Sequence, residues 1–182
     1  MYLKAYSFLL IFLVTACSTL QAPAPVRTAG YMPSESYNTA PQPLPAYYTV
    51  KKPIQCVPHA REISGVKIYG DAHTWWYQAE ANHYKRGKKP SIGAVLVLSK
   101  TSRLKYGHIG VVQNVINSRE IRVAHNNWGG DRKTRSYVYR RMPAIDVSPN
   151  NDWSQIRFWD YPSGTYGSVY KASGFIYPKK GR

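Results

Sequence analysis

Cysteine is scarce in this sequence, which limits the covalent and metal chemistry that the chain can use. The chain has two cysteines, Cys17 and Cys56. A disulfide between them would tie a tail to a domain across a flexible linker, so we expect Cys56 to remain a free thiol. The spacing of cysteine and histidine pairs that forms a zinc finger is absent. A single unpaired thiol is a candidate reactive group.

Acidic side chains are also scarce. The sequence has 9 Asp and Glu residues against 25 Lys and Arg residues, which gives a formal net charge of +16. All but two of the basic residues follow residue 50, so the positive charge belongs to a domain and attracts polyanions. There is no aromatic RNP motif and no basic helix with heptads, so we expect no nucleic acid partner. An anionic membrane surface or the acidic peptides and glycans of a cell wall fit better.

Long hydrophobic runs are missing too. The uncharged run from Ala5 to Ala16 is shorter than the about 20 residues of a membrane-spanning helix, but it fits the apolar part of a signal peptide. It ends in Val14-Thr15-Ala16-Cys17, which resembles a bacterial lipobox. The resemblance implies that residues 1–17 are a lipoprotein signal peptide and that Cys17 carries the lipid. Ser18 follows the lipobox cysteine, and a serine at this place resembles lipoproteins that are sorted to the outer membrane. We therefore expect a lipid-anchored protein of the outer membrane facing the periplasm.

The chain divides by composition into a tether and one domain. Residues 18–50 are rich in proline and have no apolar periodicity, so we expect a linker. Residues 51–182 are enough for one domain with its own core. No internal repeat is visible in the sequence, and we expect a monomer.

The stretch around Cys56 has the features of a short helix with a cysteine at its start. Pro58 suits the first turn and Gly65 suits a C-terminal stop. A thiol at a helix N-terminus lies at the positive end of the helix dipole, so the position favours the thiolate. Such a cysteine can act as a nucleophile. A buried cysteine that only fills space is the structural alternative.

A second helix and then a series of strands are expected after Cys56. Asp71 is a suitable N-cap, and Ala72, Trp75, Trp76 and Ala79 share one face at helical spacing, which predicts a core-facing helix. Helices followed by strands indicate an α+β fold with helices on one side of an antiparallel sheet. The strands are expected at 92–98, 106–115, 120–128, 136–142, 153–160 and 168–177.

Two neighbouring strands carry polar residues that suit a nucleophilic site. His108 stands at the start of one predicted strand, after a glycine. Strand alternation places His125 and Asn127 on the same row as Ile121 and Val123, where buried polar groups need partners. A cysteine on a helix, a histidine at a strand start and a polar residue on the adjacent strand form a cysteine-nucleophile arrangement. The backbone N–H of Cys56 is a candidate oxyanion donor.

These segments together resemble the CHAP domain, the cysteine- and histidine-dependent amidohydrolase/peptidase family. The resemblance is carried by Gln55-Cys56 at a helix start, Gly70-Asp71-Ala72 followed by Trp75, Gly107-His108-Ile109-Gly110, and a strand that ends in Asn126-Asn127-Trp128. It implies a papain-like α+β fold for residues 51–182. It also implies hydrolysis of an amide bond in peptidoglycan without a metal or another cofactor, by an amidase or a stem-peptide endopeptidase. Cys56 would be the nucleophile and His108 the general base, while Gln55 and Trp128 are candidates for substrate binding.

One position departs from the family pattern. The acidic residue that often precedes the Asn-Trp pair is replaced here by His125. The residue that orients His108 could therefore be His125 or Asn127. Neither side chain stabilises an imidazolium as a carboxylate would.

Two other functions follow from the same residues. The substitution at His125 supports a catalytically inactive CHAP-like lipoprotein that binds peptidoglycan or a partner. A released hydrolase or transferase that acts on another amide would require that Cys17 carries no lipid.

Overall fold

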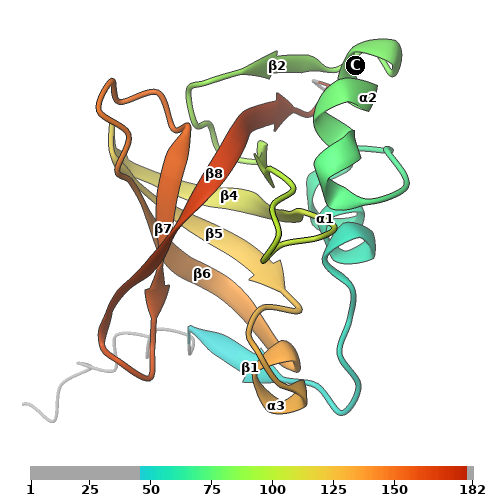
Figure 1. The fold of residues 1–182 in the computed structure, drawn as a ribbon. Helices are drawn as coiled ribbons and strands as arrows, with labels where there is room; N and C mark the ends of the chain where they lie inside the picture. Colours follow the sequence, from blue (N-terminus) through green and yellow to red (C-terminus); the bar gives the residue numbers. More distant parts are fainter. Residues whose placement is uncertain (1–45, 180–182) are drawn as a thin grey trace, which may run out of the picture. The chain divides into compact units, whose positions relative to one another are not determined.

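The structure is a computed structural model, and it describes residues 46–179 of the chain (Figure 1). The predicted signal peptide, Cys17 and most of the predicted linker lie outside the described residues. The elements are β1 (Tyr47–Thr49), α1 (Cys56–Ser64), the 3-10 turn η1 (Ala72–Thr74), α2 (Trp75–Ala81), β2 (Lys85–Gly87), β3 (Val95–Leu98), β4 (His108–Asn117), β5 (Glu120–Asn126), α3 (Arg132–Arg135), β6 (Tyr137–Asp146), β7 (Gln155–Asp160) and β8 (Thr165–Tyr177).

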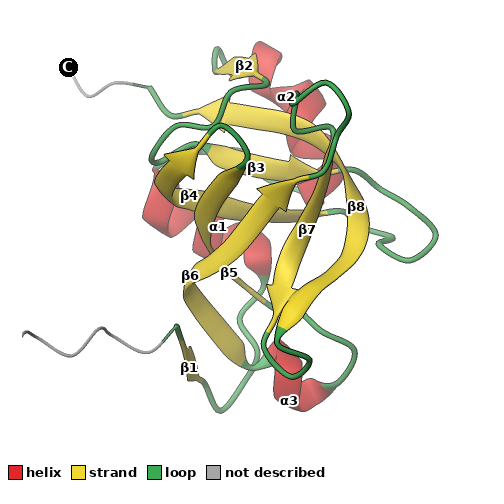
Figure 2. Ribbon diagram, turned by 90° about the vertical axis from the view of Figure 1, so that its left-hand side faces the viewer, coloured by secondary structure: helices red, strands yellow, loops and turns green. Residues whose placement is uncertain are grey.

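The central feature is an antiparallel sheet that closes on itself. Strands β3, β4, β5 and β6 pair in chain order, β7 pairs with β6 and β8, and β8 returns to pair with β3. Figure 2 shows the strands curving around this ring, with β1 and β2 added at its margins. Closure pairs both edges of the six-stranded ring, so no long strand edge is left open within it.

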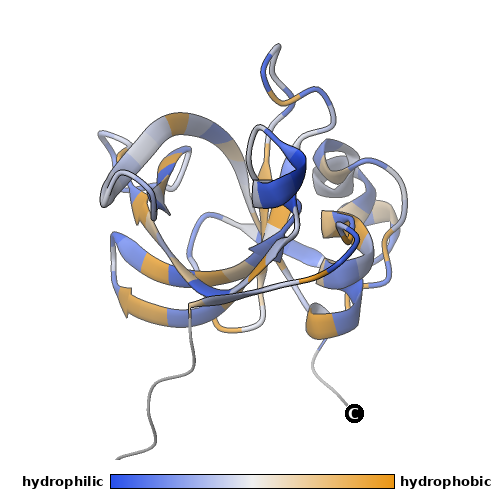
Figure 3. Ribbon diagram, turned by 90° about the horizontal axis from the view of Figure 1, so that it is seen from below, coloured by the Kyte–Doolittle hydropathy of each residue, from blue (hydrophilic) through white to orange (hydrophobic). Residues whose placement is uncertain are grey.

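The apolar side chains fall into two clusters on opposite faces of the barrel wall. Leu96 and Leu98 of β3 belong to a cluster with Val112, Ile121 and Met142, on the inner side. The alternate residues of β3, Val95 and Val97, pack with the helices on the outer side. Because successive side chains in a strand point to opposite faces, β3 is buried on both sides and its sequence is uniformly apolar. Figure 3 shows the alternation of hydrophobic and hydrophilic bands along the barrel strands.

Helix α1 packs against the outer side of β4 and β5, as its sequence predicts. Ala60 is buried in the outer cluster, and Cys56 and Val57 pack against that cluster. The helix ends at Gly65, which adopts a left-handed conformation with φ of 71° and donates its N–H to the Arg61 carbonyl. This packing fixes the first turn of α1, which carries Cys56, beside the start of β4.

The second predicted helix is present, but its first turn is a 3-10 turn. It begins as a 3-10 turn at Ala72 and continues as α2 to Ala81. Trp75 and Ala79 are fully buried, and Trp76 packs against the same outer cluster, which confirms the core-facing stripe. Asp71 occupies the N-cap position but makes no side-chain capping bond. None of the helices in residues 46–179 is long and apolar enough to cross a membrane.

The α+β class is confirmed, while two details differ from the sequence prediction. The sheet is a closed barrel rather than an open layer, and the papain-like arrangement remains a prediction. Tyr47–Thr49 pairs with Tyr137–Tyr139, so the sheet includes residues before position 51, where we placed the start of the domain. Residues 47–49 are too few for an alternation of apolar and polar side chains to distinguish an edge strand from a linker.

Candidate active site

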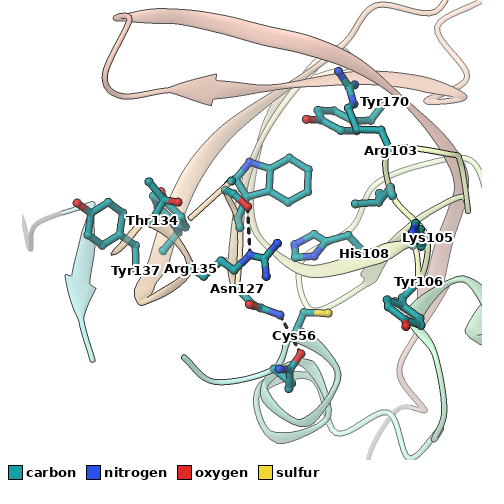
Figure 4. Close-up of a pocket in the computed structure, with 18 of the residues that line it drawn as sticks. Cys56, Arg103, Lys105, Tyr106, His108, Asn127, Thr134, Arg135, Tyr137 and Tyr170 are labelled. Atoms are coloured by element: carbon teal, nitrogen blue, oxygen red, sulfur yellow. Dashed lines mark hydrogen bonds between the residues drawn. The ribbon is translucent and has the colours of Figure 1, made fainter. Parts of the chain in front are cut away.

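A cleft of about 1180 Å³ lies where the first turn of α1 meets the barrel. Cys56, Gln55, His108, Asn127 and Trp128 all line it, although they come from segments far apart in the sequence (Figure 4). Of the residues singled out for the site within the described part of the chain, only His125 does not line this cleft. Its side chain is buried directly behind His108.

Cys56 is the first residue of α1 and a free thiol. Burial raises the pKa of this thiol above its ordinary value. Hydrogen bonding from the backbone of Ile109, Cys56 and Val57 acts in the opposite direction, and its effect is smaller than that of burial. The helix N-terminus therefore contributes as expected, but it does not lower the net thiol pKa, because the sulfur is removed from water.

His108 begins β4 and is almost completely buried, with 3% of its surface exposed. The preceding residue, Gly107, has φ of 68°, and a Cβ there would lie 2.7 Å from the His73 amide nitrogen and from the Leu98 carbonyl oxygen. Only glycine fits this close approach, which leads the chain into β4 at the cleft. Burial lowers the pKa of His108 to about 3, so its imidazole is neutral at pH 7.

One ring nitrogen of His108, Nε2, contacts His125. His108 Nε2 lies 3.0 Å from His125 Nδ1, and His125 Nε2 lies 2.9 Å from the Met142 sulfur. His125 is 1% exposed and stacks on Tyr139 and Phe158 inside the barrel. Burial, and then the nearby His108 and His59, hold the pKa of His125 well below its usual value.

These contacts determine which nitrogen of each neutral ring carries the proton. A thioether sulfur accepts hydrogen bonds but has no proton to donate, so the Met142 contact requires N–H at His125 Nε2. His125 Nδ1 is then an acceptor, and His108 Nε2–H must be the donor to it. This leaves His108 Nδ1 unprotonated, with a free lone pair for a general base.

Figure 4 shows the His108 ring and the Cys56 sulfur in the same part of the cleft. Among the described residues, no hydrogen bond joins the thiol to this ring. Such bonds between catalytic groups are often long before substrate binds.

The expected direction of Asn127 is wrong. β5 ends at Asn126, and Asn127 has φ of 52°, which turns its side chain out of the row that contains Ile121 and Val123. Its amide Nδ2 donates to the Gln55 side-chain oxygen at 2.8 Å instead of reaching His108. Of the two candidates, His125 is therefore the one in contact with His108.

Trp128 forms part of the wall behind the histidines. Its ring centre lies 4.7 Å from that of His108 and 5.7 Å from that of His125, and it also contacts Phe158 and Tyr170. This half-buried indole excludes water from the histidine pair on one side. The sequence indicated Trp128, but the contact of Met142 with His125 depends on the register of β5 and β6 and had no sequence signal.

No group of three or more His, Cys, Asp and Glu side chains in residues 46–179 is arranged to hold a metal ion. The groups at the cleft that can take part in a reaction are the Cys56 thiol and the His108 imidazole, with the His125 imidazole behind it.

Comparison with known proteins agrees with these features. Residues 46–127 match the family model of the CHAP domain. The matched segment contains Cys56, His108, His125 and Asn127, and it ends just before Trp128.

Two individual proteins also show similarity. The chain is 35% identical over 63 residues to the protein named "Probable autolysin LDP" of Staphylococcus aureus (strain NCTC 8325 / PS 47), covering 35% of this chain and 22% of that protein. The chain thus matches about a fifth of the length of this relative. The solved structure titled "The crystal structure of Ly7917" matches with a TM-score of 0.33 and 16% identity, over 68% of this chain and 85% of the other.

Proposed function

We propose that this protein hydrolyses an amide bond of peptidoglycan, with Cys56 as nucleophile and His108 as general base. The observation that carries the proposal is the cleft that brings together Cys56 at the first turn of α1 and His108 at the start of β4, with His125 behind it. The match of residues 46–127 to the CHAP domain and the similarity to a probable autolysin favour the cell wall as substrate.

The reaction begins with a neutral thiol and a neutral imidazole. As the Cys56 sulfur attacks the amide carbonyl carbon, its proton moves to His108 Nδ1, and the carbonyl oxygen becomes an oxyanion. His108 then gives this proton to the leaving nitrogen, and the C–N bond breaks to leave a thioester on Cys56. Water attacks the thioester with His108 again as base, which releases a carboxylic acid and restores the thiol.

Gln55 and the backbone of Cys56 are suited to stabilise the oxyanion. The side-chain oxygen of Gln55 accepts a hydrogen bond from Asn127, and this contact orients the Gln55 amide at the edge of the cleft. The NH₂ group of Gln55 is left to donate to a substrate. Together with the N–H of Cys56 at the start of α1, it would supply two donors for the developing charge. Asn127 then has a role in positioning Gln55 rather than His108.

A second candidate function is supported by the electrostatics of the same residues. The thiol pKa is raised, and among residues 46–179 no carboxylate contacts His108 to stabilise an imidazolium. Both features suit a cleft that binds peptidoglycan, or a partner, without cutting it. In that case the cleft would hold the wall in place, and loss of the thiol would leave wall binding unchanged.

The cellular setting is part of the proposal. A lipid on Cys17 and the tether up to the domain would hold the enzyme at the outer membrane, within reach of the wall in the periplasm. The positive charge of the domain would raise its local concentration at acidic wall polymers. The cleft brings Cys56, His108 and His125 together within one chain, so the reaction needs no second copy, and we propose that the enzyme acts as a monomer.

The proposal is tested by digestion of purified peptidoglycan with the full chain and with its Cys56→Ala variant. We expect soluble fragments, detected by mass spectrometry, from the wild type alone, while both proteins have the same circular dichroism spectrum. Equal release by the variant would refute the role of Cys56. Sedimentation of both proteins with the wall, without release by either, would favour the binding function.

A further inference from the structure

The cleft extends beyond Cys56 in two directions, and its two ends differ in chemistry. In Figure 4, Tyr137 and Thr134 lie to the left of Cys56 and His108, while Arg103, Lys105 and Tyr106 lie to the right. We refer to the left end, with Tyr47, Tyr137, Tyr139 and Tyr161, as the tyrosine arm, and to the right end, with Arg103 and Lys105, as the basic arm. Each end also holds residues of the other kind: Arg135 lies on the left and donates to the Gly129 carbonyl, and Tyr106 and Tyr170 lie on the right, so the two arms differ in which kind predominates. Most residues of the tyrosine arm lie beyond the segment matched by the family model.

The tyrosine arm is a connected group of aromatic rings. Tyr47 of β1 stacks on Tyr137 with ring centres 4.6 Å apart, and Tyr139 stacks on Tyr161 at 5.9 Å. Tyr47 also meets Tyr139 and Tyr161 edge to face, which joins the two pairs. Four rings from three separate segments therefore build one wall of the cleft.

The hydroxyl groups of this wall are unused by the described part of the protein. Within residues 46–179, no group hydrogen-bonds the hydroxyl of Tyr47, Tyr137, Tyr139 or Tyr161. Burial raises the pKa of Tyr139, and the nearby oxygens of the other three phenols and of Asp160 raise it further, as expected for oxygens that face one another. Tyr139 is itself buried and stacks on His125 and on Tyr161, so it supports the wall from behind. The partly exposed Tyr47, Tyr137 and Tyr161 offer ring surface together with donors and acceptors, which matches a sugar ring with its C–H faces and hydroxyl edges.

The basic arm has different chemistry. The Arg103 guanidinium lies 4.5 Å from the centre of the Tyr170 ring and donates to the Val169 carbonyl at 3.2 Å, so its position is fixed. Arg103 and Lys105 are both exposed, and neither is in an ion pair with a described residue. The two carboxylates of the whole cleft are Asp71 and Asp160. An oriented guanidinium and a neighbouring exposed ammonium group suit the carboxylates of a peptide.

We propose that the tyrosine arm holds a sugar of the glycan strand and the basic arm holds the stem peptide, so that the bond cut is the amide joining the two. This inference rests on the proposed function and names its substrate bond. Cys56 lies between the arms, where the lactyl carbonyl of the sugar would meet the first amino acid of the peptide.

The reaction transfers the lactyl acyl group from the peptide nitrogen to water by way of Cys56. The sulfur of Cys56 bonds to the lactyl carbonyl carbon, and the bond from that carbon to the peptide nitrogen breaks. His108 supplies the proton that leaves with the nitrogen, so the stem peptide departs with a free amine. Water then releases the lactyl group as a carboxylic acid and returns a proton to the thiol. The sugar side is therefore the acyl side, and the peptide side is the leaving group.

Three substrates distinguish a failure of this inference from a failure of the proposed function. The full chain is incubated with whole peptidoglycan, with a muramoyl-peptide, and with the same peptide lacking the sugar. We expect intact stem peptides with a free N-terminal amine from the first two substrates and no cleavage of the third. Stem peptides split internally, or cleavage of the sugar-free peptide, would overturn the inference while the proposed hydrolase remained. No release from any substrate would refute the hydrolase itself.

Variants that remove single hydroxyls test the tyrosine arm. Tyr137→Phe and Tyr161→Phe keep the aromatic rings, so we expect the KM for the muramoyl-peptide to rise about 2- to 10-fold each, with little change in kcat. Tyr77→Phe is the matched control, because Tyr77 is 75% exposed on α2 and outside the cleft. A KM unchanged from the control in both variants would overturn the assignment of this arm.

Discussion

At the scale of single residues, the unusual feature is a chain of contacts that runs from His108 through His125 to Met142. A carboxylate in the place of His125 would attract a proton onto His108 and stabilise the imidazolium. The neutral His125 ring accepts the hydrogen bond from His108 but carries no negative charge, so here the Met142 sulfur fixes the tautomer as the acceptor for the His125 Nε2–H. The base is thus prepared by orientation and not by charge.

The substitution Met142→Leu tests this account of the tautomers. Leucine keeps the apolar volume but removes the acceptor, so His125 can place its proton on either nitrogen and His108 Nδ1 is no longer always free. We expect kcat to fall about 3- to 10-fold with KM nearly unchanged. Nitrogen-15 NMR of the histidines should show mixed tautomers in place of one.

Ile156→Leu is a suitable control for this experiment, because it makes a volume-conserving change in the same buried cluster. It should leave both the tautomers and kcat as in the wild type. A Met142→Leu variant with wild-type histidine spectra would show that the sulfur does not set the tautomers.

At the scale of elements, the entry to β4 depends on one glycine. Gly107 and Gly65 both have positive φ, of 68° and 71°, but they differ in the space around a Cβ. At Gly65 nothing lies within 4 Å, whereas at Gly107 backbone atoms of His73 and Leu98 lie 2.7 Å away. Alanine substitutions at Gly65 and Gly107 therefore separate two losses of stability, one from the backbone conformation and one from a steric clash.

We expect Gly65→Ala to lower the free energy of unfolding by about 1 kcal/mol, from the conformation alone. Gly107→Ala should lower it by clearly more and should also reduce wall hydrolysis, because the clash displaces His108. Urea unfolding of the two full-chain variants measures the first quantity. Equal losses of stability in the two variants would contradict the close packing at Gly107.

Much of the element order could be predicted from the sequence, because its patterns are local. The first helix, its stop at Gly65 and the strand containing His108 lie close to their expected positions. Alternation also placed His125 correctly in the buried row with Ile121 and Val123. The same rule failed two residues later, at Asn127. A positive φ ends the strand there, and local alternation does not predict where a strand ends.

The features that could not be predicted depend on contacts between distant segments. Closure of the barrel requires β8 to pair with both β3 and β7, and single-strand patterns do not record pairing partners. The Met142 contact and the Gln55–Asn127 bond arise in the same way. Tyr137 and Tyr139 alternate along a predicted strand and so share a face, but their meeting with Tyr47 and Tyr161 required the fold.

At the scale of the whole molecule, the buried histidines link the site to stability in acid. His108 has a pKa of about 3 in the folded protein, against an ordinary value of 6.5. A depressed folded pKa means that the folded state is fully stable above pH 6.5 and loses stability as the pH falls toward 3, because the unfolded chain binds the proton first. His125 acts in the same direction.

We therefore expect the free energy of unfolding to fall by about 3 kcal/mol between pH 7 and pH 4.5 from His108 alone. The His108→Gln variant should lose correspondingly less over this range, although its stability at pH 7 can be lower. His83→Gln, at an exposed position, should follow the wild type. Urea unfolding as a function of pH provides the measurement, and parallel curves for wild type and His108→Gln would contradict the buried neutral histidine.

The claim that Cys56 performs the chemistry is tested most directly by its alkylation. In a full chain with Cys17→Ser, Cys56 is the only thiol. This chain is treated with iodoacetamide at about pH 9, because the raised thiol pKa leaves little thiolate at neutral pH. Residual wall hydrolysis is then measured beside the modified fraction of Cys56. We predict that activity falls in proportion to modification and reaches zero when Cys56 is fully alkylated; activity that persists at full alkylation would contradict the account.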